Sequence, residues 1–169
     1  MKITVNQIEE VLEKNYQEYI NNKKTKNLMF VGLYSIGKDS AIKNWAAKHN
    51  DFTLYEYCYP SQMYKENESG ILEKTSRYTY DDQTLKDISE NKTVLYCRRI
   101  NFGRNTSGDE ELIKLIKDDI YKTIFGKEYN LASRMFTVAT AYPNYQNNHN
   151  IDLSKELTSL FEIIEVEPN

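Results

Sequence analysis

The sequence predicts an α/β protein with a parallel central sheet, and two features of the chain lead to that prediction. Short apolar runs of strand length alternate with longer segments in which apolar residues recur at helical spacing. A glycine-bounded loop joins one such strand to a helix within residues 27–49, "NLMFVGLYSIGKDSAIKNWAAKH". Parallel sheets of this kind carry helices on their faces and bind ligands at the carboxyl edge of the strands. A length of 169 residues indicates one domain, 1–169, with an N-terminal helix and connector at 1–26 and a core at 27–169.

Hydrophobic periodicity gives the expected elements in chain order. The expected strands cover residues 28–33, 52–59, 93–97, 133–141 and 161–166. The expected helices cover residues 5–22, 38–49, 80–91, 108–124 and 151–160. Residues 60–80 show no clear period, so a surface excursion with room for a short helix is expected there.

Local signals support these elements in turn. Thr4 and Gln7 can form a capping box at the start of the first helix. In the second helix, Ile42 and Trp45 lie on the side that would face the core. The strand at 93–97 is apolar, as expected for a strand buried on both faces, and the helix from residue 108 starts with acids that its dipole favours.

Tyrosines gather in and beside the excursion at 60–80. Tyr59, Tyr64, Tyr78 and Tyr80 stand among Lys, Glu and Ser residues, and aromatic residues on exposed loops often contact partners. We therefore take these four as candidates for an interaction surface. The alternative is that tyrosine is simply abundant in this chain, which has 14.

Charge and cysteine usage argue against several classes of protein. The net charge is 22 minus 25, or -3, so there is no electrostatic case for a polyanionic partner or a membrane surface. No signal-peptide core or membrane-length apolar run is present, so a cytoplasmic protein is expected. Cys58 and Cys97 are interpreted as small buried hydrophobes, and with His49 and His149 they form no zinc-ligand set by spacing.

The glycine loop is the strongest candidate site. Gly32, Gly37 and Lys38 match Gly-x-x-x-x-Gly-Lys, in which backbone N–H groups cradle phosphates and the lysine pairs with their charge. The next residue in that motif is a Ser or Thr that holds Mg²⁺, and here it is Asp39. The alternative is a solvated lysine beside two glycines that only turn the chain.

Four blocks in order resemble the core of the AAA+ ATPases, most closely its MoxR-like and McrB-like branch. "GLYSIGKDS" resembles Walker A, "VLYCRRINF" the Walker B strand, "FTVATAYPN" the sensor-1 strand, and "LTSLFEIIEVEP" the end of the core. The resemblance implies a P-loop NTPase fold, a three-layer sandwich around a five-stranded parallel sheet in the order 5-1-4-3-2. The chain stops at the fifth strand, so the helical lid of the family is expected to be absent.

The same resemblance implies that the catalytic groups are missing. The two Walker B acids, which hold Mg²⁺ and orient the attacking water, correspond to Arg98 and Arg99. The sensor-1 asparagine corresponds to Tyr142, and the arginine finger to Leu160. Within the loop, Ser35 replaces a glycine, which makes a left-handed backbone less accessible.

Two of these replacements have complementary charges. Asp39 and Arg98 stand where the family has a hydroxyl and an aspartate sharing Mg²⁺, so they can form a salt bridge in place of the metal. We therefore expect no metal and no cofactor, or ATP or ADP bound without productive Mg²⁺. Arg99, Tyr142 and Leu160 join the tyrosines as candidates for interaction, the alternative for the arginines being a patch at the sheet edge.

Three functions follow from this interpretation. The favoured one is a catalytically inactive AAA+-like protein, a pseudo-ATPase that binds and inhibits or regulates a larger complex. Its expected partner is an AAA+ oligomer or a host defence machine, and its expected origin a phage or mobile element. The second is a P-loop nucleotide-binding protein with weak NTPase or phosphotransferase activity, using Lys38 with Ser35 or Ser40. The third is a nucleic-acid loader subunit, against which the net charge counts, with Lys23, Lys24, Lys26, Arg98, Arg99 and Arg104 as its basic residues.

Overall fold

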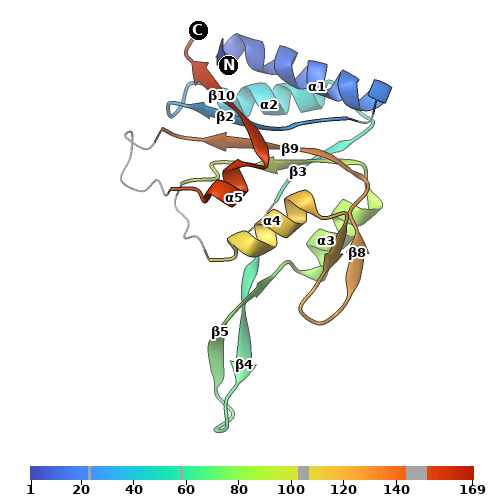
Figure 1. The fold of residues 1–169 in the computed structure, drawn as a ribbon, viewed down its shortest axis with the longest axis vertical. Coiled ribbons are helices and arrows are strands. Elements are labelled where there is room, and N and C mark those ends of the chain that lie inside the picture. The colour runs from blue at the N-terminus through green and yellow to red at the C-terminus, as the bar shows by residue number, and fades with distance from the viewer. Residues whose placement is uncertain (23, 58, 103–106, 144–151) are drawn as a thin grey trace.

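The chain folds around one six-stranded sheet (Figure 1). The computed structural model describes residues 1–22, 24–57, 59–102, 107–143 and 152–169. The strand order is β1-β10-β2-β9-β6-β3, and every pairing in the sheet is parallel. The strands are β1 (Lys2–Thr4), β2 (Asn27–Gly32), β3 (Thr53–Glu56), β6 (Thr93–Cys97), β9 (Arg134–Ala141) and β10 (Phe161–Glu167).

The predicted strand count needs correction, and the strand order gains one strand at its edge. Five strands in the order 5-1-4-3-2 were expected, whereas β1 adds a sixth at the edge beside β10. The pairing continues to the N-terminus, where the Met1 carbonyl accepts a hydrogen bond from the Glu165 N–H at 3.0 Å. Three extended residues in front of a helix have too little periodicity to be recognised as a strand.

Helices cover both faces of the sheet (Figure 1). The first two are α1 (Ile8–Asn22), which follows a 3-10 turn at Val5–Gln7, and α2 (Lys38–Ala47). The others are α3 (Asp82–Glu90), α4 (Asp109–Lys117) and α5 (Lys155–Thr158). Phe30 packs in the core with α1 and α2, whereas its neighbour Met29 packs in the core with α3, α4 and α5. Because successive strand residues face opposite ways, this alternation defines the three-layer α/β sandwich.

Residues 60–80 form a hairpin instead of the expected short helix. β4 (Ser61–Glu66) and β5 (Leu72–Thr79) pair antiparallel and project from the body of the molecule, as Figure 1 shows. At the tip, the Asn67 side chain accepts hydrogen bonds from the N–H groups of Ser69 and Ile71, and Gly70 has a positive φ of 78°. Asn and Gly at these turn positions are a hairpin signal in the sequence, although the hydrophobic periodicity of residues 60–80 gave none.

A second hairpin replaces the end of the helix expected at 108–124. α4 stops at Lys117, and β7 (Ile120–Lys122) then pairs antiparallel with β8 (Glu128–Asn130). Arg134 ends the helix by donating hydrogen bonds to the carbonyls of Leu115 and Asp118. Nothing among the described helices combines the length and the apolar character needed to cross a membrane.

Candidate phosphate-loop site

The loop between β2 and α2 has two residues in the left-handed region of the backbone. Ser35 has a left-handed φ of 59° and Gly37 one of 105°, so the loop winds onto the first turn of α2. Gly32 is required at the end of β2, because a Cβ there would lie 2.6 Å from the Val166 carbonyl oxygen of β10. Ser35 therefore adopts the left-handed conformation, which is less accessible to a serine than to a glycine because its Cβ causes steric strain there.

A cavity of about 260 Å³ opens beside this loop. Its lining comes from the loop, from the residues after β6, and from the end of β9, which all meet at the carboxyl edge of the sheet. The lining residues are Tyr34, Ser35, Ile36, Gly37, Lys38, Asp39, Ser40, Arg98, Arg99, Thr140 and Tyr142. Asp39 is the one carboxylate among them.

Lys38 is turned toward its own loop. Its Nζ donates hydrogen bonds to the carbonyls of Gly32 and Leu33, each at 2.7 Å, and lies 4.9 Å from the centre of the Tyr142 ring. The side chain is 5 % exposed, and burial lowers the pKa of Lys38 to about 8. In this position the ammonium group bonds to two backbone carbonyls, keeps a third N–H donor, and lines the cavity.

Asp39 is held by three groups of the chain. Tyr96 donates a hydrogen bond to its Oδ1 at 2.7 Å, Lys43 forms an ion pair with its Oδ2 at 3.1 Å, and the Arg98 Nε lies 3.5 Å from Oδ1. Burial alone would raise the pKa of Asp39, but the hydrogen bonds from Tyr96 and Lys43 and the charge of Arg98 lower it overall. The carboxylate is therefore ionised and its charge is already balanced by neighbouring cations.

The two arginines after β6 point to different partners. Arg98 contacts Asp39 and, at 4.0 Å, Glu56 on β3, but its buried Nε has no aligned hydrogen bond. The Arg98–Asp39 contact is thus an electrostatic pairing without the geometry of a strong hydrogen bond. Arg99 has a left-handed φ of 54°, donates its N–H to the Thr140 Oγ1 at 2.9 Å, and stacks its guanidinium 5.5 Å from the Tyr34 ring centre.

Sequence reasoning missed the role of Asn101, which holds Tyr142 in place. The Asn101 side chain accepts a hydrogen bond from the Tyr142 N–H at 2.9 Å and donates one to the Tyr142 carbonyl at 2.7 Å. Asn101 is 3 % exposed. Its position in "VLYCRRINF" was the only available signal, because the reciprocal pairing depends on the register between β6 and β9. Tyr96 and Lys43, the partners of Asp39, were also missed.

The remaining candidates lie away from the cavity. Leu160 precedes β10, and because β10 runs parallel to β2, Leu160 sits at the edge of the sheet opposite the loop. Its carbonyl accepts a hydrogen bond from the Asn27 side chain at 3.2 Å. Tyr59 and Tyr64 are exposed and Tyr78 is half-buried. Tyr80 is 3 % exposed in the core, which removes it from the surface set.

Part of the sequence argument concerns residues beyond the described ranges. Lys23, Cys58, Arg104 and His149 lie outside them. Within the described residues, no group of three or more His, Cys, Asp or Glu side chains is placed to hold a metal ion.

Comparison with known proteins supports the fold. No protein-family model and no curated protein sequence matches the chain. Among solved structures, the crystal structure of a "putative ATPase" from Cytophaga hutchinsonii ATCC 33406 superimposes with a TM-score of 0.52 at 15% sequence identity. The match covers 98% of this chain and 52% of that one, so this chain spans about half of its length. The likeness shows that the two proteins share an α/β fold over this chain, and it extends to nothing else.

Proposed function

We propose that this chain is a catalytically inactive AAA+-like protein, a pseudo-ATPase that acts as a binding or regulatory factor on a larger protein complex. The observation that carries the proposal is the surroundings of Asp39, which follows Lys38 at the metal position of the motif and pairs with Lys43 and Arg98. Lys38 directs two of its three N–H donors to the carbonyls of Gly32 and Leu33, so one donor remains for a phosphate.

The metal position supports the same function. Hydrolysis in P-loop enzymes needs an acid and a hydroxyl around Mg²⁺, together with a group that positions water. Among the described residues that line the cavity, Asp39 is the one carboxylate, and it already contacts Tyr96, Lys43 and Arg98. A metal ion entering there would meet two cations, Arg98 and Arg99, at the positions where the enzymes supply acids.

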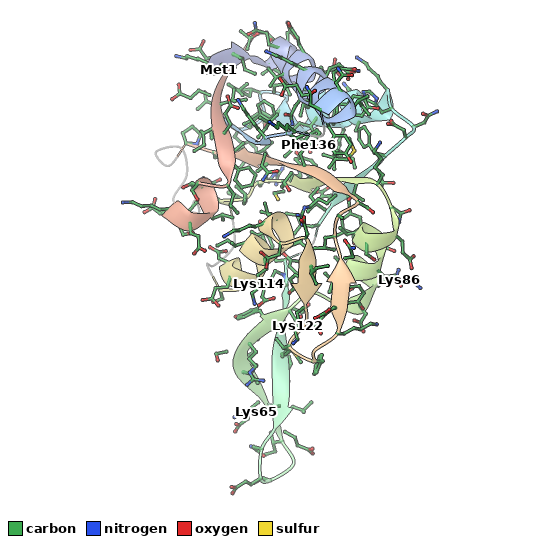
Figure 2. All side chains as sticks on the ribbon, turned by 45° about the vertical axis from the view of Figure 1, so that its right-hand side comes forward. Met1, Lys65, Lys86, Lys114, Lys122 and Phe136 are labelled. Atoms are coloured by element: carbon green, nitrogen blue, oxygen red, sulfur yellow. The ribbon has the colours of Figure 1, made fainter. Side chains whose placement is uncertain are left out.

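The β4–β5 hairpin is the part of the chain that we assign to partner binding. Its tip and outer surface expose Tyr64, Ile71 and Leu72 at 54%, 62% and 68%. Figure 2 shows Lys65 on this arm, far from Phe136 in the sheet. Apolar side chains held at the end of a projecting arm are available for contact with another protein. An AAA+ oligomer or a host defence complex is the partner class that the sequence resemblance favours.

The test is nucleotide binding by the purified protein, measured by calorimetry and by thermal unfolding. ATP, ADP and GTP are each added with and without Mg²⁺. We expect no stabilisation by Mg-nucleotide, in the wild type or in Lys38→Ala. Arg98→Asp, which restores an acid at the family's position, is the matched comparison. A ligand at a hundredfold excess over its Kd would add about 2.7 kcal/mol to the free energy of unfolding. A gain of that size that Lys38→Ala abolishes would overturn the proposal.

One observation favours the second candidate, a nucleotide-binding protein without efficient turnover. The loop keeps left-handed residues at Ser35 and Gly37 and an open cavity beside them. The same titration separates the two functions, because this candidate requires binding that depends on Lys38.

A further inference from the structure

We infer that the cavity beside the phosphate loop is a docking pocket for an acidic side chain of the partner protein, held by Arg98 and Arg99. The inference rests on the proposed function and deepens it, because it names the chemistry by which the partner is recognised. It adds a charged contact to the apolar contact that the β4–β5 arm supplies. The group that the pocket takes is the carboxylate of a glutamate or an aspartate.

The lining of the cavity is positively charged, although the chain as a whole is not. Lys38, Arg98 and Arg99 contribute three positive charges and Asp39 contributes one negative charge, which leaves a net charge of +2 among the described lining residues. The whole chain has a net charge of -3. A concave site lined mainly by one sign of charge attracts ligands of the opposite sign. The cavity is therefore suited to an anion, in a chain whose overall charge does not favour one.

Both arginines reach the cavity because the chain turns at Arg99. Successive residues of an extended strand point to opposite faces, so neighbouring side chains share a cavity only where the backbone turns. β6 ends at Cys97, and Arg99 has a left-handed φ of 54°. The hydrogen bond from the Arg99 N–H to the Thr140 Oγ1, at 2.9 Å, holds this turn. The turn therefore places both arginines in one lining.

The two guanidinium groups have donors left for a ligand. The Arg98 Nε lies 3.5 Å from the Asp39 Oδ1 without an aligned hydrogen bond, and the Arg98 Nη1 lies 4.0 Å from the Glu56 Oε1. The Arg98 side chain is 35% exposed, so a ligand can reach it from the cavity. Among the ion pairs of the described residues, none involves Arg99, whose guanidinium lies 5.5 Å from the Tyr34 ring centre. Arginine carries five N–H donors in a fork that matches the two oxygens of a carboxylate.

The size and the fixed charge of the site favour a carboxylate over a nucleotide or a phosphate. The cavity has a volume of about 260 Å³, whereas pockets for drug-sized ligands span roughly 300–1,000 Å³. Asp39 stays in the lining as a carboxylate paired with Lys43 and Arg98. A phosphate group carries a charge of about −1.5 to −2, so Asp39 repels it up to roughly twice as strongly as it repels a singly charged carboxylate.

The first readout is the Nε–H resonance of Arg98 in ¹H–¹⁵N NMR spectra of the full chain, assigned by its loss in Arg98→Lys. The probe is the capped tripeptide N-acetyl-Gly-Glu-Gly-amide, and the matched control is its analogue with Gln in place of Glu. We expect the glutamate peptide to shift the resonance in a saturable titration, and the glutamine peptide to leave it unchanged. This comparison is made on the wild type, so it does not depend on the folding of any variant.

Arg99→Gln is expected to weaken binding of the glutamate peptide about tenfold, the effect of losing a charge-assisted hydrogen bond. Lys48→Gln is the matched control, because it removes the same charge outside the cavity lining, at a side chain that is 67% exposed and pairs with Glu9. It should leave the Kd unchanged. Thermal unfolding of both variants checks that they fold.

The inference is overturned if the glutamine peptide shifts the Arg98 resonance as the glutamate peptide does, or if folded Arg99→Gln binds like the wild type. Inorganic phosphate is the third probe, and phosphate binding tighter than that of the glutamate peptide would also overturn it. Failure here is distinguishable from failure of the proposed function. Mg-nucleotide binding by the wild type contradicts the pseudo-ATPase, whereas absent binding of the glutamate peptide contradicts only the docking pocket.

Discussion

The phosphate loop and the β4–β5 arm use their side chains in opposite ways. At the loop, Lys38, Asp39 and Arg98 find partners within the chain, and the ring of Tyr142 covers the lysine. On the arm, Tyr64, Ile71 and Leu72 are apolar and more than half exposed. The difference indicates that the charged side chains of the loop are stabilised by contacts within the chain. The side chains of the projecting hairpin, in contrast, remain exposed to solvent. The predictions below separate these two regions by their effect on stability.

The largest effect is expected from Asn101→Ala. The substitution leaves the buried N–H and carbonyl of Tyr142 without their side-chain partner, which should lower the free energy of unfolding by about 3 kcal/mol. Urea unfolding measures the change. Asn44→Ala, at an exposed position in α2, is the matched control and should change stability by about 0.5 kcal/mol or less. Equal losses in both variants would show that Asn101 has no special role.

A pH effect of about 2 kcal/mol is expected from Lys38. Burial lowers its pKa from 10.5 to about 8 in the folded state. The unfolded chain therefore binds more protons between these values, and stability rises with pH through that window. Relative to Lys38→Met, which does not titrate, the wild type should gain about 2 kcal/mol between about pH 7 and pH 9.5. A flat difference across that range would mean that Lys38 is not desolvated.

Ser35→Gly should stabilise the chain by about 1 kcal/mol. The left-handed φ of 59° strains a residue with a Cβ, and glycine removes that strain at a smaller loss of chain entropy. The shift in thermal midpoint measures the gain, with the exposed Ser40 of α2 mutated to glycine as a control that should destabilise. If Ser35→Gly lowers the midpoint, the loop is not held in the strained conformation.

The smallest effect on stability is expected on the arm. The double substitution Ile71→Ser and Leu72→Ser alters exposed side chains at the hairpin tip, so stability should change by about 0.5 kcal/mol or less. Co-purification with a partner complex should nevertheless be lost in this variant. Lys38→Ala should keep the same partner, since it alters only the loop. Retained binding by the arm variant would place the contact surface elsewhere.

The sequence was informative where local pattern decides structure. Periodicity located the sheet strands β2, β6 and β9, and the glycine loop located the edge of the sheet where the cavity lies. The β4–β5 hairpin was harder to predict. Asn67 and Gly70 mark its turn, but the two strands are so exposed that their apolar and polar residues do not alternate clearly. The edge strand β1 was missed because its three residues are too few to show a period.

The arrangement inside the site could not be predicted from residue types alone. The Lys38 Nζ bonds to the carbonyls of its own loop and lies against the ring of Tyr142, which follows a strand far away in sequence. The position of Tyr142 depends in turn on Asn101 and on the register between β6 and β9. Such reciprocal contacts appear only once the strands are placed side by side.

The most direct test of the proposed function is a crystal structure of the protein grown or soaked with millimolar ATP and Mg²⁺. We expect the Lys38 Nζ to remain on the carbonyls of Gly32 and Leu33, with the Tyr142 ring over it and no ordered triphosphate in the cavity. An ordered nucleotide with coordinated Mg²⁺ and with Lys38 turned onto its phosphates would contradict the account.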